Sequence, residues 1–359
     1  MYRPFLFRSF IFILTLSSTS VFAQTNVSGI NKSGPADATK LTQAYLNPLF
    51  KGLGLGLNSG WNNTAHAKNV ARFELRFGLT GSFIPEKDKL FDVTKIGLSR
   101  NVRPANSANF LAPTVAGNTS AGPVMDVFDD NNRRVESFTL PQGQNLPFVP
   151  APQIQATVGL PKGIDLTLRA VPKVNLGTDF GSVSMIGGGI KVEILPLIAG
   201  KTLKKVLPID IAVAVGYTQL NYKLPLNVQP QGGASAKDAQ QSQDFSNQMI
   251  DAKFAGINAE AIVSKKLLFF TPFLSVGYNT SKTNALLKGN YPMVTGATLL
   301  GQPTYTTFTD PVNISQNDIN GFRANVGFQL NLAFLRVYTS YSAGDYNAVN
   351  FGLGIGLGK

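Results

Sequence analysis

The chain has 359 residues, a formal net charge of +12, one histidine and no cysteine, and 43% of its residues are hydrophobic. A metal centre or a nucleophilic site built on histidine and cysteine is therefore not expected. Beyond the N-terminus, no uncharged apolar run approaches the roughly 20 residues that a membrane-spanning helix needs, which excludes a helical membrane protein.

Residues 1–23 have the three parts of a signal peptide. Arg3 and Arg8 form a basic start, residues 10–16 form an apolar core, and Val21-Phe22-Ala23 resembles a cleavage site. The apolar core is too short to serve as a membrane anchor. The sequence therefore predicts export through a cleaved signal peptide.

The positive charge persists after export. The 32 basic residues less Arg3 and Arg8 leave 30 against 20 acidic residues, a net charge of +10 for the exported chain. Because export argues against a nucleic-acid partner, we interpret this excess as attraction to lipid head groups and to the phosphates of lipopolysaccharide.

Residues 24–50 are expected to form a linker and a short helix over residues 36–46. Leu41 and Tyr45 have helical spacing, and Pro48 is expected to end or kink the helix. A helix this short needs a surface to pack on. Two placements are open: a small plug inside a barrel, or a helix against the periplasmic rim.

From residue 51 to residue 359 the hydrophobic pattern has period two, which is typical of strands. Residues 322–330 place Phe322 and Phe328 on one face and Arg323 and Gln329 on the other. About 12 strands, and up to 14, are predicted. The 12 are 53–61, 73–79, 91–98, 153–160, 164–169, 180–194, 209–218, 250–263, 267–280, 322–330, 335–341 and 349–358.

Apolar residues that alternate with charged ones along so many strands indicate a wall with lipid on one side and a polar interior on the other. A soluble β-sandwich does not explain charges opposite Phe and Leu. The sequence therefore predicts an all-β fold, a transmembrane antiparallel β-barrel in the outer membrane. We expect the barrel assembly machinery to insert it.

Four segments resemble an uncharacterised family of exported outer-membrane barrels from Bacteroidota. They are 45–54 (YLNPLFKGLG), 158–163 (VGLPKG), 207–210 (LPID) and 216–218 (GYT). The resemblance covers nearly the whole exported chain. Because that family has no established activity, it implies fold and location only. One departure is the final Lys359, where many such barrels end in an aromatic residue that helps assembly.

The candidate functional residues are charged side chains on the inward phase of the strands. Those predicted to line the lumen are Arg72, Glu74, Arg76, Asp165, Arg169, Asp210, Arg323 and Arg336, with Lys191 and Glu193 on the same phase. They form either a salt-bridge lattice that holds the barrel together or the wall of a wet lumen that favours anions.

No catalytic, cofactor or metal site is predicted, and we expect no enzyme. The single histidine, His66, is expected to be a solvated residue in a short external loop. The predicted function is passive passage of small solutes through the outer membrane. The alternative is a non-conducting barrel whose long loops, 100–151 and 281–318, bind a partner.

Overall fold

The protein is described by a computed structural model. It covers residues 27–178, 180–198, 209–230, 232–298 and 302–357. The predicted signal peptide, residues 1–23, and the terminal Lys359 lie outside the described residues.

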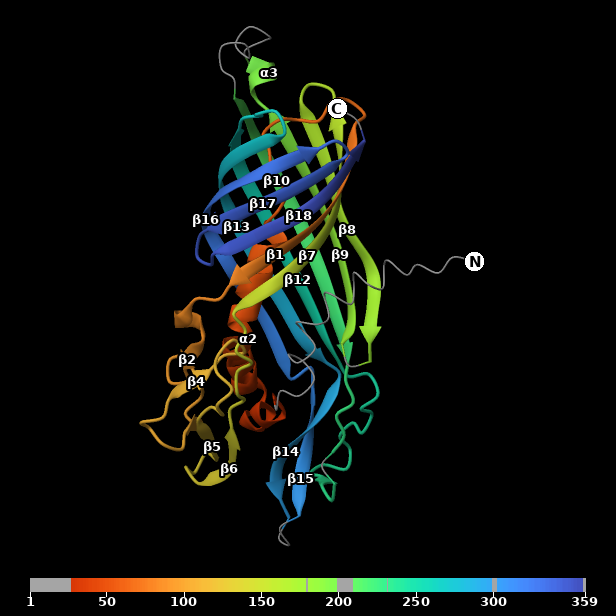
Figure 1. Cartoon of the computed structure of the whole chain (residues 1–359). Coiled ribbons are helices and arrows are strands. Elements are labelled where there is room, and N and C mark those ends of the chain that lie inside the picture. Colours follow the sequence, from red (N-terminus) through yellow and green to blue (C-terminus); the bar gives the residue numbers. More distant parts are fainter. Residues whose placement is uncertain (1–26, 179, 199–208, 231, 299–301, 358–359) are drawn as a thin grey trace.

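Antiparallel strands close into a barrel in the order β1-β18-β17-β16-β13-β12-β10-β9-β8-β7 (Figure 1). Their bounds are Phe73–Phe83 (β1), Phe148–Leu160 (β7), Ile164–Gly177 (β8), Gly181–Glu193 (β9), Asp210–Pro225 (β10), Met249–Ser264 (β12), Phe270–Lys288 (β13), Val312–Leu332 (β16), Leu335–Ala343 (β17) and Ala348–Leu357 (β18). Because β1 pairs with β18 on one side and with β7 on the other, the sheet has no open edge.

The barrel has 10 strands, so the prediction of 12 to 14 was wrong. Ten of the twelve predicted segments each correspond to one wall strand. The other two do not reach the wall: residues 53–58 belong to a helix, and within 91–98 only the end of the short strand β2 (Leu90–Asp92) is extended.

The N-terminal helix α2 (Pro35–Asn58) is twice as long as predicted and continues through Pro48. Its C-terminal half lies inside the barrel, where it contacts β1, β7, β10, β12, β13 and β16. The helix fits because of glycines. A Cβ on Gly52 would lie 2.5 Å from Val149 Cγ2, and one on Gly56 would overlap Ala151 Cβ, both on β7.

Gly54 packs on the opposite side of the helix. A Cβ there would lie 2.7 Å from Ser281 Cβ on β13. Residues two positions apart in a helix differ by about 200° around its axis, so an alternating Gly-Leu run places glycines toward two facing walls. The same alternation predicts a strand from sequence alone, which explains the error at 53–61.

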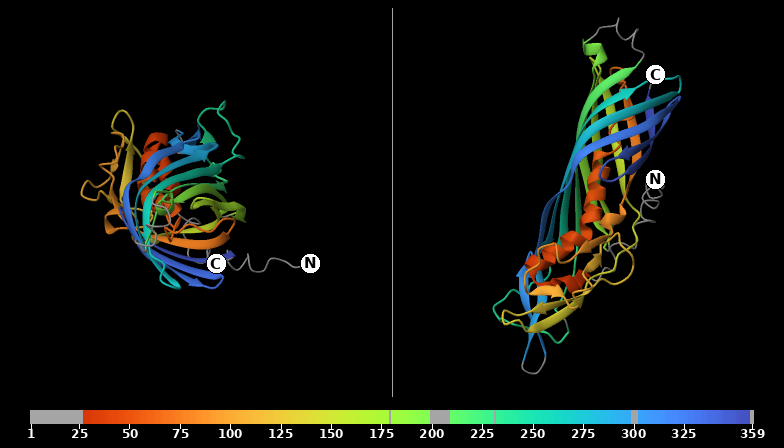
Figure 2. Two further views of the ribbon diagram at one scale, coloured as in Figure 1. Left: turned by 90° about the horizontal axis from the view of Figure 1, so that it is seen from above. Right: turned by 90° about the vertical axis from the view of Figure 1, so that its left-hand side faces the viewer.

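After α2, residues 59–72, which we call the tail, continue through the lumen to the end with short turns. There the Ala71 amide donates to the Gly159 carbonyl, and Phe73 opens β1 opposite Val158. The chain thus enters the barrel from the end with long connections and leaves it at the other end before it builds the wall (Figure 2).

The long connections are folded. Residues 84–147, the outer extension, carry η2 (Glu86–Asp88) and two small sheets, β2 with β4 (Leu111–Pro113), and β3 (Val102–Pro104) with β5 (Val124–Phe128) and β6 (Arg134–Thr139). A second extension pairs β14 (Asn290–Ala297) and β15 (Pro303–Thr309) with β11 (Ser235–Ala236). The outer extension packs against α2 and the 3-10 helix η1 (Val27–Ser33) in one apolar core. A short helix α3 (Leu195–Ile198) lies at the opposite end.

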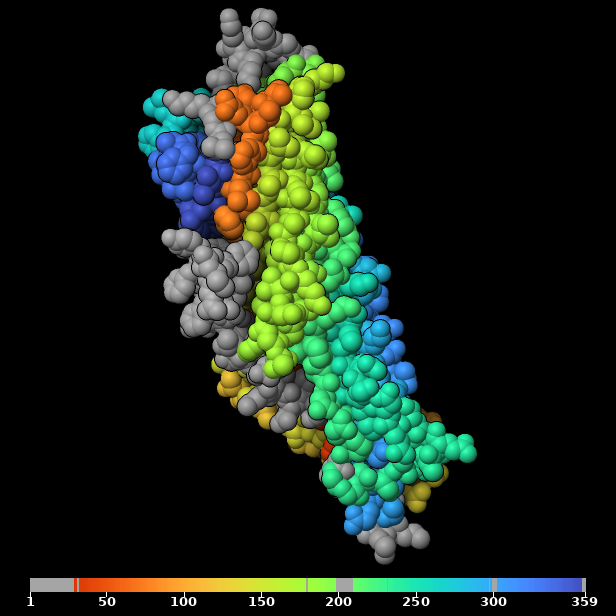
Figure 3. All heavy atoms as spheres, turned by 90° about the vertical axis from the view of Figure 1, so that its right-hand side faces the viewer, coloured from red at the N-terminus to blue at the C-terminus, as the bar shows by residue number. Residues whose placement is uncertain are grey.

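The wall has an apolar outer face and a polar inner face. On β13, Leu274 and Val276 are 60% exposed on the outside, whereas Ser275 and Asn279 are buried inside. Figure 3 shows the outer surface of β8 to β10 as a continuous wall of side chains. No helix among the described residues is both long and apolar enough to cross a membrane.

This face assignment gives a first prediction. Leu274→Arg should prevent stable insertion into lipid, because a cation at the middle of a barrel wall costs about 2–4 kcal/mol. Leu268→Arg is the matched control, since Leu268 is 87% exposed in the turn between β12 and β13. The measurement is the heat-modifiable, membrane-inserted fraction of each variant. Equal fractions would contradict the orientation of β13.

Candidate functional site

The most distinctive feature of the lumen is how it holds the end of α2. Arg169 on β8 is fully buried, and its Nη1 donates to the Leu57 carbonyl at 2.8 Å and its Nη2 to the Ser59 carbonyl at 3.1 Å. Its guanidinium also lies 4.0 Å from the centre of the Trp61 ring. The last carbonyls of a helix lack intrahelical partners and carry partial negative charge. Arg169 supplies both the missing hydrogen-bond donors and a compensating positive charge.

Two further arginines bind the same region from other strands. Arg323 on β16 donates from Nη2 to the Asn58 carbonyl at 2.9 Å and from Nη1 to Ser59 Oγ at 2.7 Å. Arg76 on β1 donates from Nη2 to the Trp61 carbonyl at 2.8 Å. The helix end is therefore fixed by cations from three parts of the wall.

The tail is held to the wall closer to the short-turn end. Lys191 Nζ donates to the carbonyls of Thr64 at 3.0 Å and His66 at 2.9 Å, and it lies 2.9 Å from Asp165 Oδ2. The Lys68 amide donates to Asp165 Oδ1 at 2.8 Å. The ion pair between two wall strands thus also fixes the backbone of the tail.

Glu74 on β1 collects a second set of partners. Lys68 Nζ from the tail lies 2.8 Å from Glu74 Oε2, and Arg336 and Tyr338 on β17 bind the same carboxylate. One buried anion therefore joins the tail, β1 and β17.

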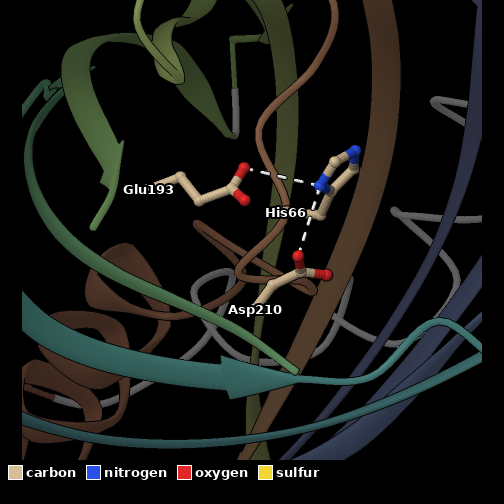
Figure 4. Close-up of side chains that lie close together, drawn as sticks. All are labelled: His66, Glu193 and Asp210. Atoms are coloured by element: carbon tan, nitrogen blue, oxygen red, sulfur yellow. Dashed lines mark ion pairs between the residues drawn. The ribbon is translucent and has the colours of Figure 1, made fainter. Parts of the chain in front are cut away.

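The third attachment is a cluster at the rim. His66 Nδ1 lies 3.4 Å from Glu193 Oε2, at the end of β9, and 3.6 Å from Asp210 Oδ1, at the start of β10 (Figure 4). The interaction with Asp210, and then that with Glu193, raises the pKa of the His66 imidazole to about 9 against the opposing effect of burial. His66 thus belongs to the tail and lies beside two carboxylates, and is not in the short external loop that we expected.

The predicted lumen residues can now be placed. Six are buried and face inward: Glu74, Arg76, Asp165, Arg169, Asp210 and Arg323. Arg336 is partly buried on β17, whereas Arg72 is exposed just before β1. The strand phase predicts the inward set. It does not show that three of the arginines bind backbone carbonyls of α2 and the tail.

Together these features define a class of protein: a ten-stranded transmembrane-type β-barrel whose lumen is occupied by its own N-terminal helix and tail. The chain belongs to a family of unknown function, DUF6588, whose family model matches residues 1–357. None of the curated proteins matches the chain. An origin in Bacteroidota stays a prediction.

Several solved barrels are similar to this chain. Ail, the attachment invasion locus protein of Yersinia pestis, is 9% identical, with 80% of this chain and 98% of Ail covered and a TM-score of 0.26. The outer membrane protease OmpT from Escherichia coli is 10% identical, with 83% and 97% covered and a TM-score of 0.30.

The translocator domain of the autotransporter NalP from Neisseria meningitidis is 8% identical, with 91% of this chain and 98% of that chain covered and a TM-score of 0.28. At these scores the similarity carries no argument, so the barrel architecture is established by the strand pairing of this chain. Its function has to be inferred from the residues of its lumen.

Proposed function

We propose that this protein is an outer-membrane barrel that is closed at rest by α2 and the tail, and that admits small polar solutes when the tail moves. The observation that carries the proposal is the polar character of the contact between tail and wall. Its hydrogen bonds, such as Lys191 to the Thr64 carbonyl and Asn62 Nδ2 to Glu260 Oε1 at 2.9 Å, are of a kind that water can replace. Exchange of such bonds with water costs little per bond.

The location and partners belong to the same proposal. The apolar outer face, the closed sheet and the predicted export support an outer-membrane position, with lipid and lipopolysaccharide around the wall and insertion by the barrel assembly machinery. We propose no catalytic role for the barrel.

The charge of the lumen favours anionic solutes. Movement of the tail would uncover the guanidinium of Arg76, which now faces the Trp61 carbonyl, and the sides of Arg169 and Arg323 that now face Ser59. Rings of cations in a narrow passage attract anions and repel cations. The open state should therefore prefer small anions, more so at low salt, where screening is weak.

One observation favours a second function. The outer extension, residues 84–147, is folded into two small sheets around α2. An ordered structure at the end with long connections suits a barrel that binds a partner there and does not conduct.

A reversible disulfide between the tail and the wall distinguishes the two proposed functions experimentally. Thr64 Oγ1 on the tail lies 3.1 Å from Ser264 Oγ on β12, and the chain has no cysteine of its own. In a planar bilayer, wild type should show stepwise openings. The oxidised Thr64→Cys/Ser264→Cys pair should be silent, and reduction should restore the openings.

Thr64→Cys alone is the control, since it cannot cross-link. A folded wild type that never conducts would favour the surface-binding alternative. Openings that persist after the disulfide has formed would show that the tail is not the gate.

A further inference from the structure

The rim cluster of His66, Glu193 and Asp210 has an unusual geometry for an ion pair. The Nδ1 atom of His66 is buried and makes no hydrogen bond of normal geometry. Its separations of 3.4 Å and 3.6 Å from the two carboxylate oxygens exceed the usual N–H···O range of about 2.7–3.2 Å. The nitrogen lies between the two carboxylates (Figure 4).

The same separations suit three atoms that share one cation. Metal–ligand distances of about 2.0–2.2 Å place the ligands of a tetrahedral ion about 3.3–3.6 Å apart. One atom each from His66, Glu193 and Asp210 lies within 4.8 Å of the others. A small shift of one carboxylate therefore brings all three within reach of the same ion.

The charges around the cluster also favour a cation. Glu193 and Asp210 are 2% and 8% exposed, and both lie close to His66 Nδ1. Two buried carboxylates side by side favour a positive charge next to them. A proton on His66 or a metal ion supplies such a charge.

Two details prepare the ligands. The Ala67 amide donates to Glu193 Oε2 at 2.9 Å, which fixes the orientation of that carboxylate. The His66 side chain is 44% exposed, so an ion and its waters can reach the site from the rim. Three protein ligands and open positions for water are a common arrangement for zinc.

We propose that His66, Glu193 and Asp210 form a binding site for one divalent transition-metal ion, with Zn²⁺ the best fit to one imidazole nitrogen and two carboxylate oxygens. The site joins three elements: the tail, the end of β9 and the start of β10. A bound ion would staple the tail to the rim. This inference goes beyond the proposed passage of solutes and holds whether or not the barrel conducts.

The test is Zn²⁺ binding to the untagged, folded full-length protein, measured by titration calorimetry. His66 is the single histidine and the chain has no cysteine, so imidazole or thiolate ligation elsewhere does not interfere. We expect one Zn²⁺ per chain, with Mg²⁺ bound far more weakly. His66→Asn, Glu193→Gln and Asp210→Asn should each weaken Zn²⁺ binding at least about 100-fold, more than loss of an outer partner of a ligand does.

Glu136→Gln and Asp251→Asn are matched controls, because these carboxylates pair with Lys32 and Lys223 far from the rim. Both should bind Zn²⁺ as wild type does. X-ray absorption of the wild-type complex tests the site without any variant, and it should show one imidazole in an otherwise oxygen shell. Folded wild type without stoichiometric Zn²⁺, an oxygen-only shell, or affinity unchanged in the folded His66→Asn variant would overturn the proposal.

Discussion

Replacing Arg169 by methionine should lower the free energy of unfolding by about 3–5 kcal/mol. The change keeps most of the side-chain volume but removes the donors to the Leu57 and Ser59 carbonyls, which lie in the closed lumen. Removing one partner from a buried charged interaction leaves the other uncompensated, and the cost is of this size. Urea unfolding in detergent micelles measures it.

The matched control is Arg133→Met in the outer extension. Arg133 is 76% exposed and pairs with Asp129 at 3.1 Å, so its loss should cost less than about 1 kcal/mol. If the two variants were equally stable, the bonds from Arg169 to the helix end would not hold α2 in the lumen.

The wall of the barrel could be predicted from sequence because a two-sided environment leaves a period-two pattern. In β16, for example, Phe322 and Val326 face outward and Arg323 is buried inside, as the pattern predicts. The phase of such a strand depends only on local alternation between lipid and lumen. Of the eight predicted lumen residues, six are buried, Arg336 is partly buried, and Arg72 is exposed just before β1.

The plug, which consists of α2 and the tail, could not be predicted in the same way, because its residue pattern is set by contacts with residues distant in the sequence. Gly52, Gly54 and Gly56 alternate with leucines as they would in a strand, yet they are small because β7 and β13 press on a helix from two sides. Pro48 also favours an early end to the helix. Packing inside the barrel outweighs that preference.

The hydrogen-bond partners of the site residues could not be predicted from the sequence either. Arg169 and Arg323 have no sequence neighbour that identifies a helix end as their target, since the backbone oxygens of Leu57 and Asn58 carry no signal in the sequence. His66 was misplaced because the residues before it were assigned to a wall strand. Once α2 and the tail are known to lie in the lumen, a single histidine shortly before a strand with an inward charge indicates a position at the rim of the barrel.

Introducing alanine at both Gly54 and Gly56 should loosen the plug, although the same change stabilises an ordinary helix. In an exposed helix each Gly→Ala change favours folding by about 1 kcal/mol. Here the new Cβ atoms would collide with Ser281 and Ala151 on facing walls. Overpacking of this kind costs about 1–3 kcal/mol per site, and occasionally more.

We therefore expect a net loss of about 2 kcal/mol in the closed state, which raises the ratio of open to closed barrels about 30-fold. In a planar bilayer the double variant should open far more often than wild type. Gly78→Ala on β1 is the control, because a Cβ there would meet nothing nearer than 3.8 Å.

The sign of the change in the free energy of unfolding shows whether the barrel wall packs tightly against α2 or leaves it free. A double variant that unfolds at higher urea than wild type would show that propensity, and not the walls, governs α2. A destabilised variant that stays silent while its tail becomes sensitive to protease would show that the plug moves without opening a passage. Only destabilisation together with more frequent openings supports both the tight packing of α2 between the facing walls and the closing of the passage by α2 and the tail.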